Sequence, residues 1–312
     1  DRQLLVNNIL YNATVTYFNW LKTYNEKGVY EDFLSNAEMR FIGIKKSFEV
    51  GDKPAIDTLE ARIALNNRKL YLEKSRITFV KSSLELSNYL WLNANTPIEI
   101  KDRIIPDANT FDTIDLTLNT SNLDIESFDI ENHPKLQSLD YKFQNLNIEK
   151  RLKLNNLLPQ IDLQYNFLSQ TPEVSRSFST SAYKSGVNMS FPLFLRKERG
   201  DLKLAKIKLQ DTKFEIQNTR VGLKNKINAI SQELDSYIIQ NDYTDTIVDD
   251  YSKMLSAEER KFFLGESSLF LVNSRESKLI DAKLKAIEIE NSFFKTKAKL
   301  FNVLALSEAQ IN

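Results

Sequence analysis

The chain has 312 residues, and its 42 lysines and arginines balance its 42 aspartates and glutamates, so an overall basic charge that would drive nucleic-acid binding is excluded. It contains no cysteine, which excludes disulfides, thiolate metal sites and a cysteine nucleophile, and one histidine, which leaves little room for a histidine metal cluster or proton relay. Only 7 glycines and 7 prolines interrupt it, so we expect mostly long helices. There is no run of about 18 apolar residues, so no transmembrane helix is predicted.

The first two helices are predicted from helical spacing and from the turn between them. Apolar residues recur at this spacing from about Arg2 to Phe48. In the turn that follows, Gly51 suits a helix C-cap and Pro54 suits the first position of the next helix. That second helix should run to about Asn93.

The second predicted helix carries two apolar seams. One consists of Leu65, Leu72, Phe79 and Leu86, and the other of Leu59, Ile63, Leu70, Ile77, Val80, Leu84 and Trp91. Two seams indicate a neighbour on each side, as in a closed ring or sheet of helices. A core helix of an ordinary bundle is the alternative.

Residues 95–132 change character, because they contain two prolines and many Asp, Asn and Thr residues. The short apolar alternation of Ile114, Leu116 and Leu118 indicates an extended connector with little regular helix. A third helix is expected from His133 to about Asn156, with His133 capping or packing at its start.

The apolar period changes from 3.6 to 2.0 at about Pro159 and returns after Phe194. This change predicts one β-hairpin with strands near Leu158–Leu168 and Ala182–Leu193. Each strand is close to the length of about 9–11 residues that crosses a bilayer when tilted. A soluble hairpin that packs its apolar face on the helices is the alternative.

Two long helices complete the chain. The segment from Asp201 to about Phe263 has no proline and predicts one helix of roughly 60 residues, or about 90 Å. Gly265 ends it, and a last helix should run from about Ser267 to Leu306. Its heptad seam consists of Leu279, Ala282, Ala286, Ile289, Phe293, Thr296, Leu300 and Val303.

An internal repeat relates the two halves of the chain. A shift of 214 positions places Phe48 on Phe262 and Gly51 on Gly265, and it gives 10 identities in the 43 positions from 48 to 90 without a gap. Because both turn glycines coincide, the two helical hairpins are interpreted as copies of one unit.

Five short motifs follow one another in order along the chain. They are Phe48-Glu49-Val50-Gly51, His133-Pro134-Lys135-Leu136, Leu157-Leu158-Pro159-Gln160-Ile161, Ser190-Phe191-Pro192-Leu193-Phe194 and Phe262-Phe263-Leu264-Gly265-Glu266-Ser267-Ser268. In this order they resemble the tip turns, the helix start and the strand entry and exit of the TolC family of outer-membrane efflux ducts. The resemblance extends from Arg2 to about Leu306.

The resemblance implies a mainly α fold, in which long coiled-coil helices form two structural repeats and one antiparallel β-hairpin contributes to a transmembrane β-barrel. The expected parts are a helical hairpin of the first repeat (1–94), an equatorial connector (95–132), a short tunnel helix of the second repeat (133–156), the barrel hairpin (157–195) and the long helical hairpin of the second repeat (196–312). The sequence begins inside the first repeat, so we expect a fragment that cannot close the native barrel.

The function implied is the exit duct of a tripartite efflux or type I secretion system in the outer membrane and periplasm of a Gram-negative bacterium. Such a duct is a homotrimer in outer-membrane lipid, and a periplasmic adaptor (membrane fusion) protein connects it to an inner-membrane transporter. It is a passive conduit and needs no catalytic residue, metal, cofactor or nucleic acid. The alternative is a non-catalytic periplasmic coiled-coil adaptor or structural protein. No G-x-S-x-G, Walker loop, H-E-x-x-H or Gly-rich fingerprint suggests an enzyme.

Three sets of site residues are expected on this interpretation. The periplasmic tip, a ring of small, polar and acidic groups that narrows the pore and docks the adaptor, consists of Gly51, Asp52, Lys53, Pro54, Asp57, Gly265, Glu266, Ser267, Ser268 and Leu269. The lipid-facing set consists of Ile161, Leu163, Tyr165, Phe167, Val187, Met189 and Phe191. The lumen-facing set consists of Gln160, Asp162, Gln164, Asn166, Asn188 and Ser190.

Overall fold

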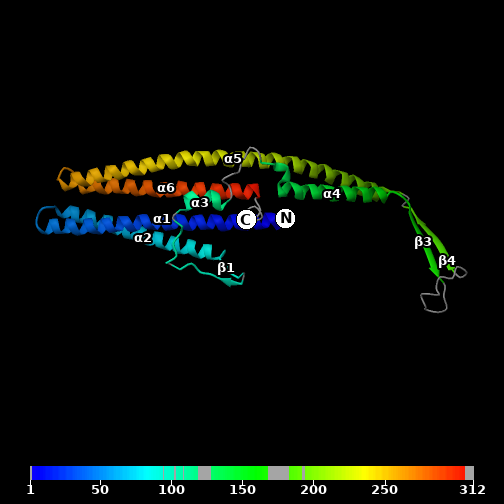
Figure 1. Cartoon of the computed structure of the whole chain (residues 1–312), viewed down its shortest axis with the longest axis horizontal. Helices are drawn as coiled ribbons and strands as arrows, with labels where there is room; N and C mark the ends of the chain where they lie inside the picture. The colour runs from blue at the N-terminus through cyan, green and yellow to red at the C-terminus, as the bar shows by residue number, and fades with distance from the viewer. Residues whose placement is uncertain are drawn as a thin grey trace. The chain divides into compact units, whose positions relative to one another are not determined.

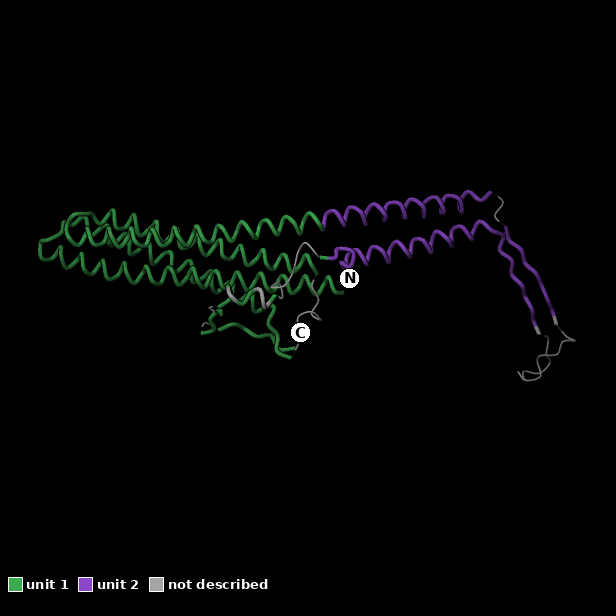
Figure 2. The backbone as a smooth tube through the Cα atoms, turned by 45° about the horizontal axis from the view of Figure 1, so that its top comes forward, with its two compact units in different colours: residues 1–128, 224–312 green, residues 129–223 purple. Residues whose placement is uncertain are grey.

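The computed structural model of the chain describes residues 2–93, 95–101, 103–107, 109–118, 128–167, 183–191 and 194–305, without the side chains of 112, 115–117, 167 and 183. The chain forms two compact units (Figure 2). Unit 1 contains Asp1–Phe128 and Lys224–Asn312, and unit 2 contains Asp129–Leu223. The predicted strand ends at 168, 182, 192 and 193 lie outside the described residues.

Unit 1 is built from two helical hairpins (Figure 1). One pairs α1 (Arg2–Glu49) with α2 (Ala55–Ser87), and the other pairs the C-terminal part of α5 (Arg196–Phe263) with α6 (Leu269–Leu304). The chain is mainly helical, as predicted. None of the described helices combines the length and the hydropathy that crossing a membrane requires.

Helix α6 is buried on more than one side. Its predicted heptad seam is buried except at Ala286, which is half-buried. On a different face, the ring of Phe294 stacks on Phe18 of α1 with centroids 5.1 Å apart, and a single hydrophobic cluster joins this pair to Ile230 of α5. Burying such side chains contributes about 1.5–3 kcal/mol each. α6 therefore connects the two hairpins of unit 1.

One carboxylate, that of Glu276, is buried in this apolar surface of α6. Its side chain is 2% exposed and forms ion pairs with Arg40 of α1 and Arg68 of α2. Arg40 also donates to Glu259 of α5 at 2.9 Å, so the network contacts four helices. Because a buried charge without partners is costly, this network favours one register of the four helices over others.

The two seams predicted on α2 have different environments. The first is buried except at the half-buried Leu72, and it packs on α1, where Trp20 and Phe79 stack with centroids 6.3 Å apart. The second is exposed along its length except at the half-buried Val80. Within one chain, therefore, α2 has a neighbour on one seam only.

The connector contains a helix that the sequence analysis did not predict. Helix α3 (Thr110–Thr117) lies where the alternation of Ile114, Leu116 and Leu118 indicated an extended chain. Ile114 and Leu118 are buried in the same cluster as Phe18. Residues four apart share a helix face, so helical geometry brings both side chains into one core, and this burial overrides the apparent period of two.

Helix α2 also ends earlier than the predicted Asn93. The chain reverses into a small ribbon, in which β1 (Trp91–Leu92) pairs antiparallel with β2 (Thr96–Pro97). The N–H of Ile98 donates to the carbonyl of Leu90 at 3.0 Å and extends this ribbon. The N–H groups of residues 88–90 still donate to carbonyls of the last helical turn, from Glu85 to Ser87, and the ribbon begins directly after them.

Unit 2 contains α4 (Pro134–Asn155), preceded by the short 3₁₀-helix η1 (Ile130–Asn132), and the N-terminal part of α5. His133 caps α4, because its Nδ1 accepts the N–H of Lys135 at 3.1 Å. The side chain of His133 is also buried. Its predicted role in capping or packing is confirmed.

The hairpin of β3 (Gln160–Phe167) and β4 (Tyr183–Ser190) is antiparallel, as predicted, and belongs to unit 2. Its register places Ile161 opposite Met189 and Leu163 opposite Val187, so the apolar residues of both strands share one face. This face is exposed, and Leu163 has 81% of its surface accessible. The alternative of a soluble hairpin with its apolar face in a core is therefore wrong.

Helix α5 has 68 residues, which correspond to about 100 Å, and it starts before the predicted Asp201. Leu195 has a φ of 48°, and its carbonyl accepts the N–H of Arg199 at 3.0 Å. Gly200, the residue before the predicted start, lies inside the helix. The left-handed residue Leu195 directly precedes the helix.

We expect Glu276→Ala to lower the free energy of unfolding by about 3–5 kcal/mol, because Arg40 and Arg68 would keep buried charges without their carboxylate. Glu49→Ala is the control, since it removes an exposed pair with Lys45 and should cost about 0–1 kcal/mol. Denaturant unfolding monitored by circular dichroism compares the two variants. Equal losses would contradict a buried, helix-joining role for Glu276.

Candidate functional site

Both helical hairpins of unit 1 end in the same kind of turn. Gly51 and Gly265 have φ of 81° and 79°, which only a residue without a Cβ adopts at little cost. In each turn the glycine N–H and the next N–H donate back to the end of the helix, namely Gly51 to Phe48, Asp52 to Ser47, Gly265 to Phe262 and Glu266 to Lys261, at 2.8–3.1 Å. This is the Schellman pattern. The repeat of 214 positions is therefore also a repeat of backbone geometry.

The two turns lie at the same end of unit 1, as the repeat predicted (Figure 1). The ammonium group of Lys53, in the first turn, lies 4.8 Å from the ring centroid of Phe262, which precedes the second turn. Below them, Ile44 of α1, Ala61 of α2 and Leu269 of α6 form one hydrophobic cluster. The two turns thus form a single tip, made of residues 47–57 and 261–270.

The helices that leave the tip begin differently. Pro54 is the N-cap of α2, with φ −74° and ψ 155°, so the helix starts one residue later than predicted. Ser268 is the N-cap of α6, and its Oγ accepts the N–H of Leu271 at 3.4 Å. Only the second turn therefore has a side-chain cap.

A short hydrogen bond fixes the second turn. The hydroxyl of Ser267 donates to Oε1 of Glu258 at 2.5 Å, and Nε of Arg275 lies 3.6 Å from the other oxygen. This hydrogen bond, followed by the charge of Arg275, holds the pKa of Glu258 below its usual value. Its stabilising effect is present above the usual glutamate pKa and is lost as the pH falls through the lowered one. Glu258 was not among the predicted tip residues, since no local pattern relates it to Ser267.

The surface of the tip is more apolar than predicted. Asp52 and Glu266 are exposed, and so are large hydrophobic side chains, above all Phe263, at 90%, and Val50, at 80%. Val50 and its repeat equivalent Leu264 directly precede the turn glycines, where the reversing backbone directs them outward. Leu269 is only 1% exposed, so it supports the turn and offers a partner almost no surface. Val50, Phe263 and Leu264 belong to the tip motifs in the sequence, but the predicted tip set began at the turn glycines and therefore did not include them.

The hairpin of unit 2 has two chemically different faces. The register groups the six polar residues predicted to face a lumen on one side, and it adds Lys184, which lies opposite Asn166. Successive strand residues point to opposite faces, so counting back from Val187 on the apolar face would have placed Lys184 on the polar face from sequence alone. Asp162 and Asn188 are paired on this same face. The apolar face lies on the other side of the same two strands, so the hairpin is amphipathic across its thickness.

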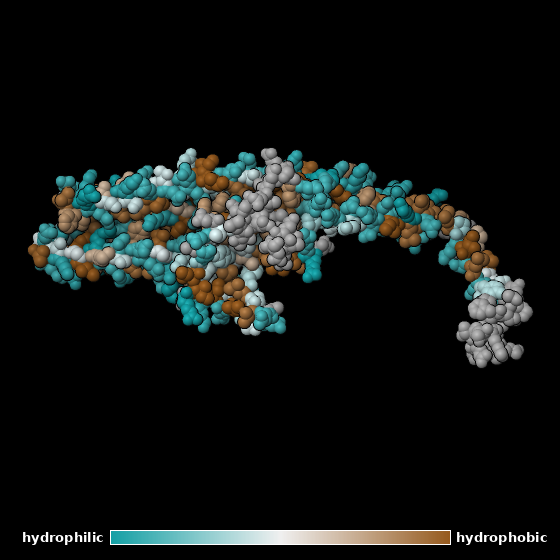
Figure 3. All heavy atoms as spheres, viewed as in Figure 1, coloured by the Kyte–Doolittle hydropathy of each residue, from teal (hydrophilic) through white to brown (hydrophobic). Residues whose placement is uncertain are grey.

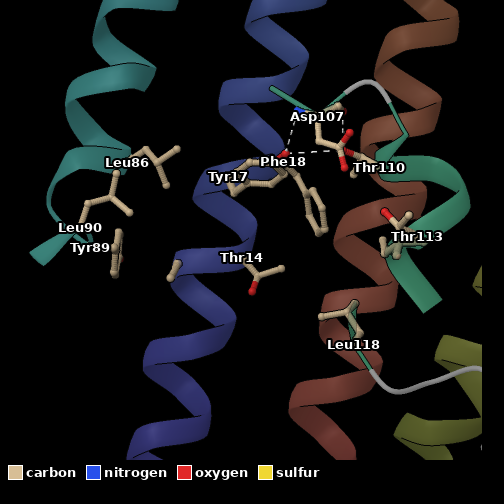
Figure 4. Close-up of a pocket in the computed structure, with 12 residues that line it drawn as sticks. Thr14, Tyr17, Phe18, Leu86, Tyr89, Leu90, Asp107, Thr110, Thr113 and Leu118 are labelled. Atoms are coloured by element: carbon tan, nitrogen blue, oxygen red, sulfur yellow. Dashed lines mark hydrogen bonds between the residues drawn. The ribbon is translucent and has the colours of Figure 1, made fainter. Parts of the chain in front are cut away.

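A hollow of about 450 Å³ opens where α1, the end of α2 and the connector meet (Figure 4). Leu86, Phe18 and Ile114 line its apolar part. The hydroxyl of Tyr17 accepts the backbone N–H of Asp107 at 3.4 Å and lies 3.4 Å from the hydroxyl of Thr110. These contacts attach the connector to α1. The polar residues around the hollow therefore have a structural role, which is to hold the connector in place.

Metal binding has no support in the part of the chain that the structure describes. No group of three or more histidine, aspartate or glutamate side chains there is arranged to hold an ion.

Comparison with models of known protein families finds a match to this chain. The family model described as "Outer membrane efflux protein" matches residues 129–306, more than half of the chain. No curated protein sequence matches it.

Solved structures show the same fold at low identity. The Campylobacter jejuni CmeC outer membrane channel is 15% identical, with a TM-score of 0.73 over 97% of this chain and 63% of its own. The outer membrane protein VceC of Vibrio cholerae is 12% identical, with a TM-score of 0.72 over 96% of this chain and 70% of its own. The Neisseria gonorrhoeae MtrE outer membrane channel is 11% identical, with a TM-score of 0.71 over 97% of this chain and 67% of its own. The chain thus spans about two thirds of the length of these channels.

We expect Gly265→Val to destabilise the chain by about 1–2 kcal/mol or more, because a side chain strains a left-handed residue. No atom beyond the two neighbouring residues lies within 4 Å of the added Cβ, so the cost is backbone strain rather than a clash. Gly222→Val is the matched control, since this glycine has equal space and lies within α5. It should be neutral or slightly stabilising. Thermal unfolding measures both, and similar losses would argue against backbone strain at the tip.

Proposed function

Because the chain belongs to the outer membrane efflux protein family, and with it to the outer membrane and periplasm, we propose that it is part of the exit duct of a tripartite efflux pump or type I secretion system. In this role it is a passive conduit for substrates that an inner-membrane transporter delivers. The family consists of channels rather than enzymes. The observation that carries the proposal is the exposed, two-faced hairpin of β3 and β4.

The hairpin has the properties of barrel strands. Each strand has 8 residues, and the apolar face, which includes Leu163 and Val187, is exposed where a soluble protein would bury it. Facing lipid would remove this surface from water. The polar face, which includes Gln164 and Asn188, would line a water-filled lumen, since such groups are costly in hydrocarbon. A coiled-coil adaptor or structural protein, the alternative function, has no use for such a hairpin.

The exposed seam of α2 supports assembly with further copies. Leu59, Ile63 and Leu70 continue this seam along the helix, and each is exposed in the single chain. Coiled-coil helices bury such seams against a partner. We propose that neighbouring copies cover the seam in a homotrimer, and that the helices then enclose a tunnel.

The tip of unit 1 is the proposed contact with a periplasmic adaptor. Its turns are rigid, because two Schellman caps and a shared apolar cluster hold them. Phe263 and Val50 project from it as apolar anchors, and the exposed Asp52 and Glu266 lie beside them as polar groups. Apolar anchors with a polar rim are typical of protein interfaces.

We expect Leu163→Arg to reduce the yield of membrane-inserted trimer strongly, because a charge on the lipid face of a barrel costs about 2–4 kcal/mol near the midplane. Gln164→Arg lies one residue away on the opposite face and should be far milder. The measurement is the amount of trimer in the outer membrane fraction for each variant. If both variants insert equally well, or if Gln164→Arg is the worse of the two, the hairpin does not face lipid as proposed.

The adaptor contact is tested with Glu266→Cys as a crosslinking position, since this side chain is exposed and leaves the hydrogen bond of Ser267 intact. Phe263→Asp should reduce crosslinking to the adaptor and lower export, while trimer yield stays unchanged, because a charge replaces an apolar anchor. Phe263→Leu keeps an apolar side chain and should preserve both. Unchanged crosslinking and export in Phe263→Asp would remove the tip from the contact.

A further inference from the structure

The base of the hairpin, where α4 ends and α5 begins, is strongly basic. Residues 148–159 and 194–206 contain eight lysines and arginines but only three acids, in a chain whose net charge is zero. We call these eight residues the basic collar. They are Lys150, Arg151, Lys153, Arg196, Lys197, Arg199, Lys203 and Lys206. All belong to unit 2.

The fold leaves most of the collar unneutralised. Lys153 pairs with Asp201 at 3.4 Å, but no ion pair to another described residue neutralises Arg196, Lys197 or Arg199. These three side chains are exposed in the first turn of α5, where the helix dipole disfavours cations. Their charges therefore do not stabilise the helix, and an external anion would relieve their repulsion.

Exposed apolar side chains are interleaved with these cations. Leu152, Leu158 and Phe191 are each more than half exposed, and Phe194 is 78% exposed. The apolar face of the strands begins directly beyond them, at Ile161. Figure 3 shows hydrophobic and hydrophilic side chains mixed along this end of α4 and α5. The surface thus combines positive charge with apolar contact area.

A hollow of about 850 Å³ lies in the middle of this surface. Lys153 and Lys197 line it from the two helices, together with the carboxylates of Glu198 and of Asp201, the partner of Lys153. Asn156 and Gln160 add amide groups. Phe191 lines its apolar side. Ammonium and amide N–H donors beside an apolar wall suit a phosphate group that is attached to an acyl chain.

We propose that the basic collar binds the phosphate groups of anionic glycerophospholipids at the membrane surface where the hairpin enters the bilayer. This inference rests on the proposed function, since it requires β3 and β4 to face lipid. The phosphates neutralise Arg196, Lys197 and Arg199, and the exposed leucines and phenylalanines contact the upper acyl chains. The collar would thereby set the depth of the hairpin in the membrane.

The apolar side chains between the cations favour an anionic phospholipid as the ligand over other anions. A nucleic acid or a free phosphate ion would neutralise the cations but would leave Phe194 and Leu158 in water. An acidic protein is also less suited, because the cations adjoin a strand face that the proposed function already assigns to lipid. Among these ligands, an anionic phospholipid is the one that matches both the cations and the apolar side chains.

The experiment measures flotation of the chain with phosphatidylcholine vesicles and with vesicles that also contain phosphatidylglycerol. We expect wild type to partition more strongly into the anionic vesicles, and salt to weaken this preference. A variant with Arg196→Gln, Lys197→Gln and Arg199→Gln should lose the preference by on the order of a hundredfold. The matched control carries Lys213→Gln, Lys224→Gln and Lys226→Gln, three exposed lysines farther along α5, and should behave as wild type.

Three results of the flotation experiment would contradict the inference. Equal partition into both vesicle types, or equal losses in the variant and its control, overturns the lipid site while leaving the membrane hairpin in place. No partition into either vesicle overturns the hairpin proposal and the collar with it. Inorganic phosphate that abolishes the preference more strongly than chloride at equal ionic strength shows a free-anion site, and this too overturns the inference.

Discussion

The burial of α6 on more than one side holds unit 1 together. Its apolar residues pack against α1 and α5, and the carboxylate of Glu276 pairs with arginines from α1 and α2. Such a charge is tolerated only where its partners are in place. The network therefore determines how the helices align along one another more than it adds to the free energy of unfolding. The position of the tip follows from this register, because both turns close directly beyond the helices that the network connects.

The single chain leaves much of its apolar surface unburied, in two places that call for different partners. The seam on α2 has the heptad spacing of a helix interface, so another helix fits it. The face of the hairpin has a period of two and exposed aliphatic side chains, which a lipid environment fits. The geometry of each exposed surface thus limits what can cover it, and both fit a duct assembled from several copies in a membrane.

The tip and the base of the hairpin differ in chemistry. The tip presents apolar side chains from rigid turns and carries charges of both signs, as a surface for another protein does. The base presents an excess of cations, of which Lys153 pairs with Asp201 while Arg196, Lys197 and Arg199 have no described acid as an ion-pair partner, and these cations are mixed with apolar groups. These compositions support the proposed protein partner at the first surface and the proposed phospholipid at the second.

The sequence by itself determined the features that depend on local geometry. The change of period at Pro159 predicted the strands, the glycines at 51 and 265 predicted the turns, and the heptad spacing in the last helix predicted its buried seam, because each pattern reflects the backbone of its own segment. Only the tertiary structure decided where helix α3 forms, which seam of α2 is buried, and that Glu276 meets Arg40 and Arg68. These features depend on contacts between residues up to hundreds of positions apart, and neither propensity nor period carries information about them.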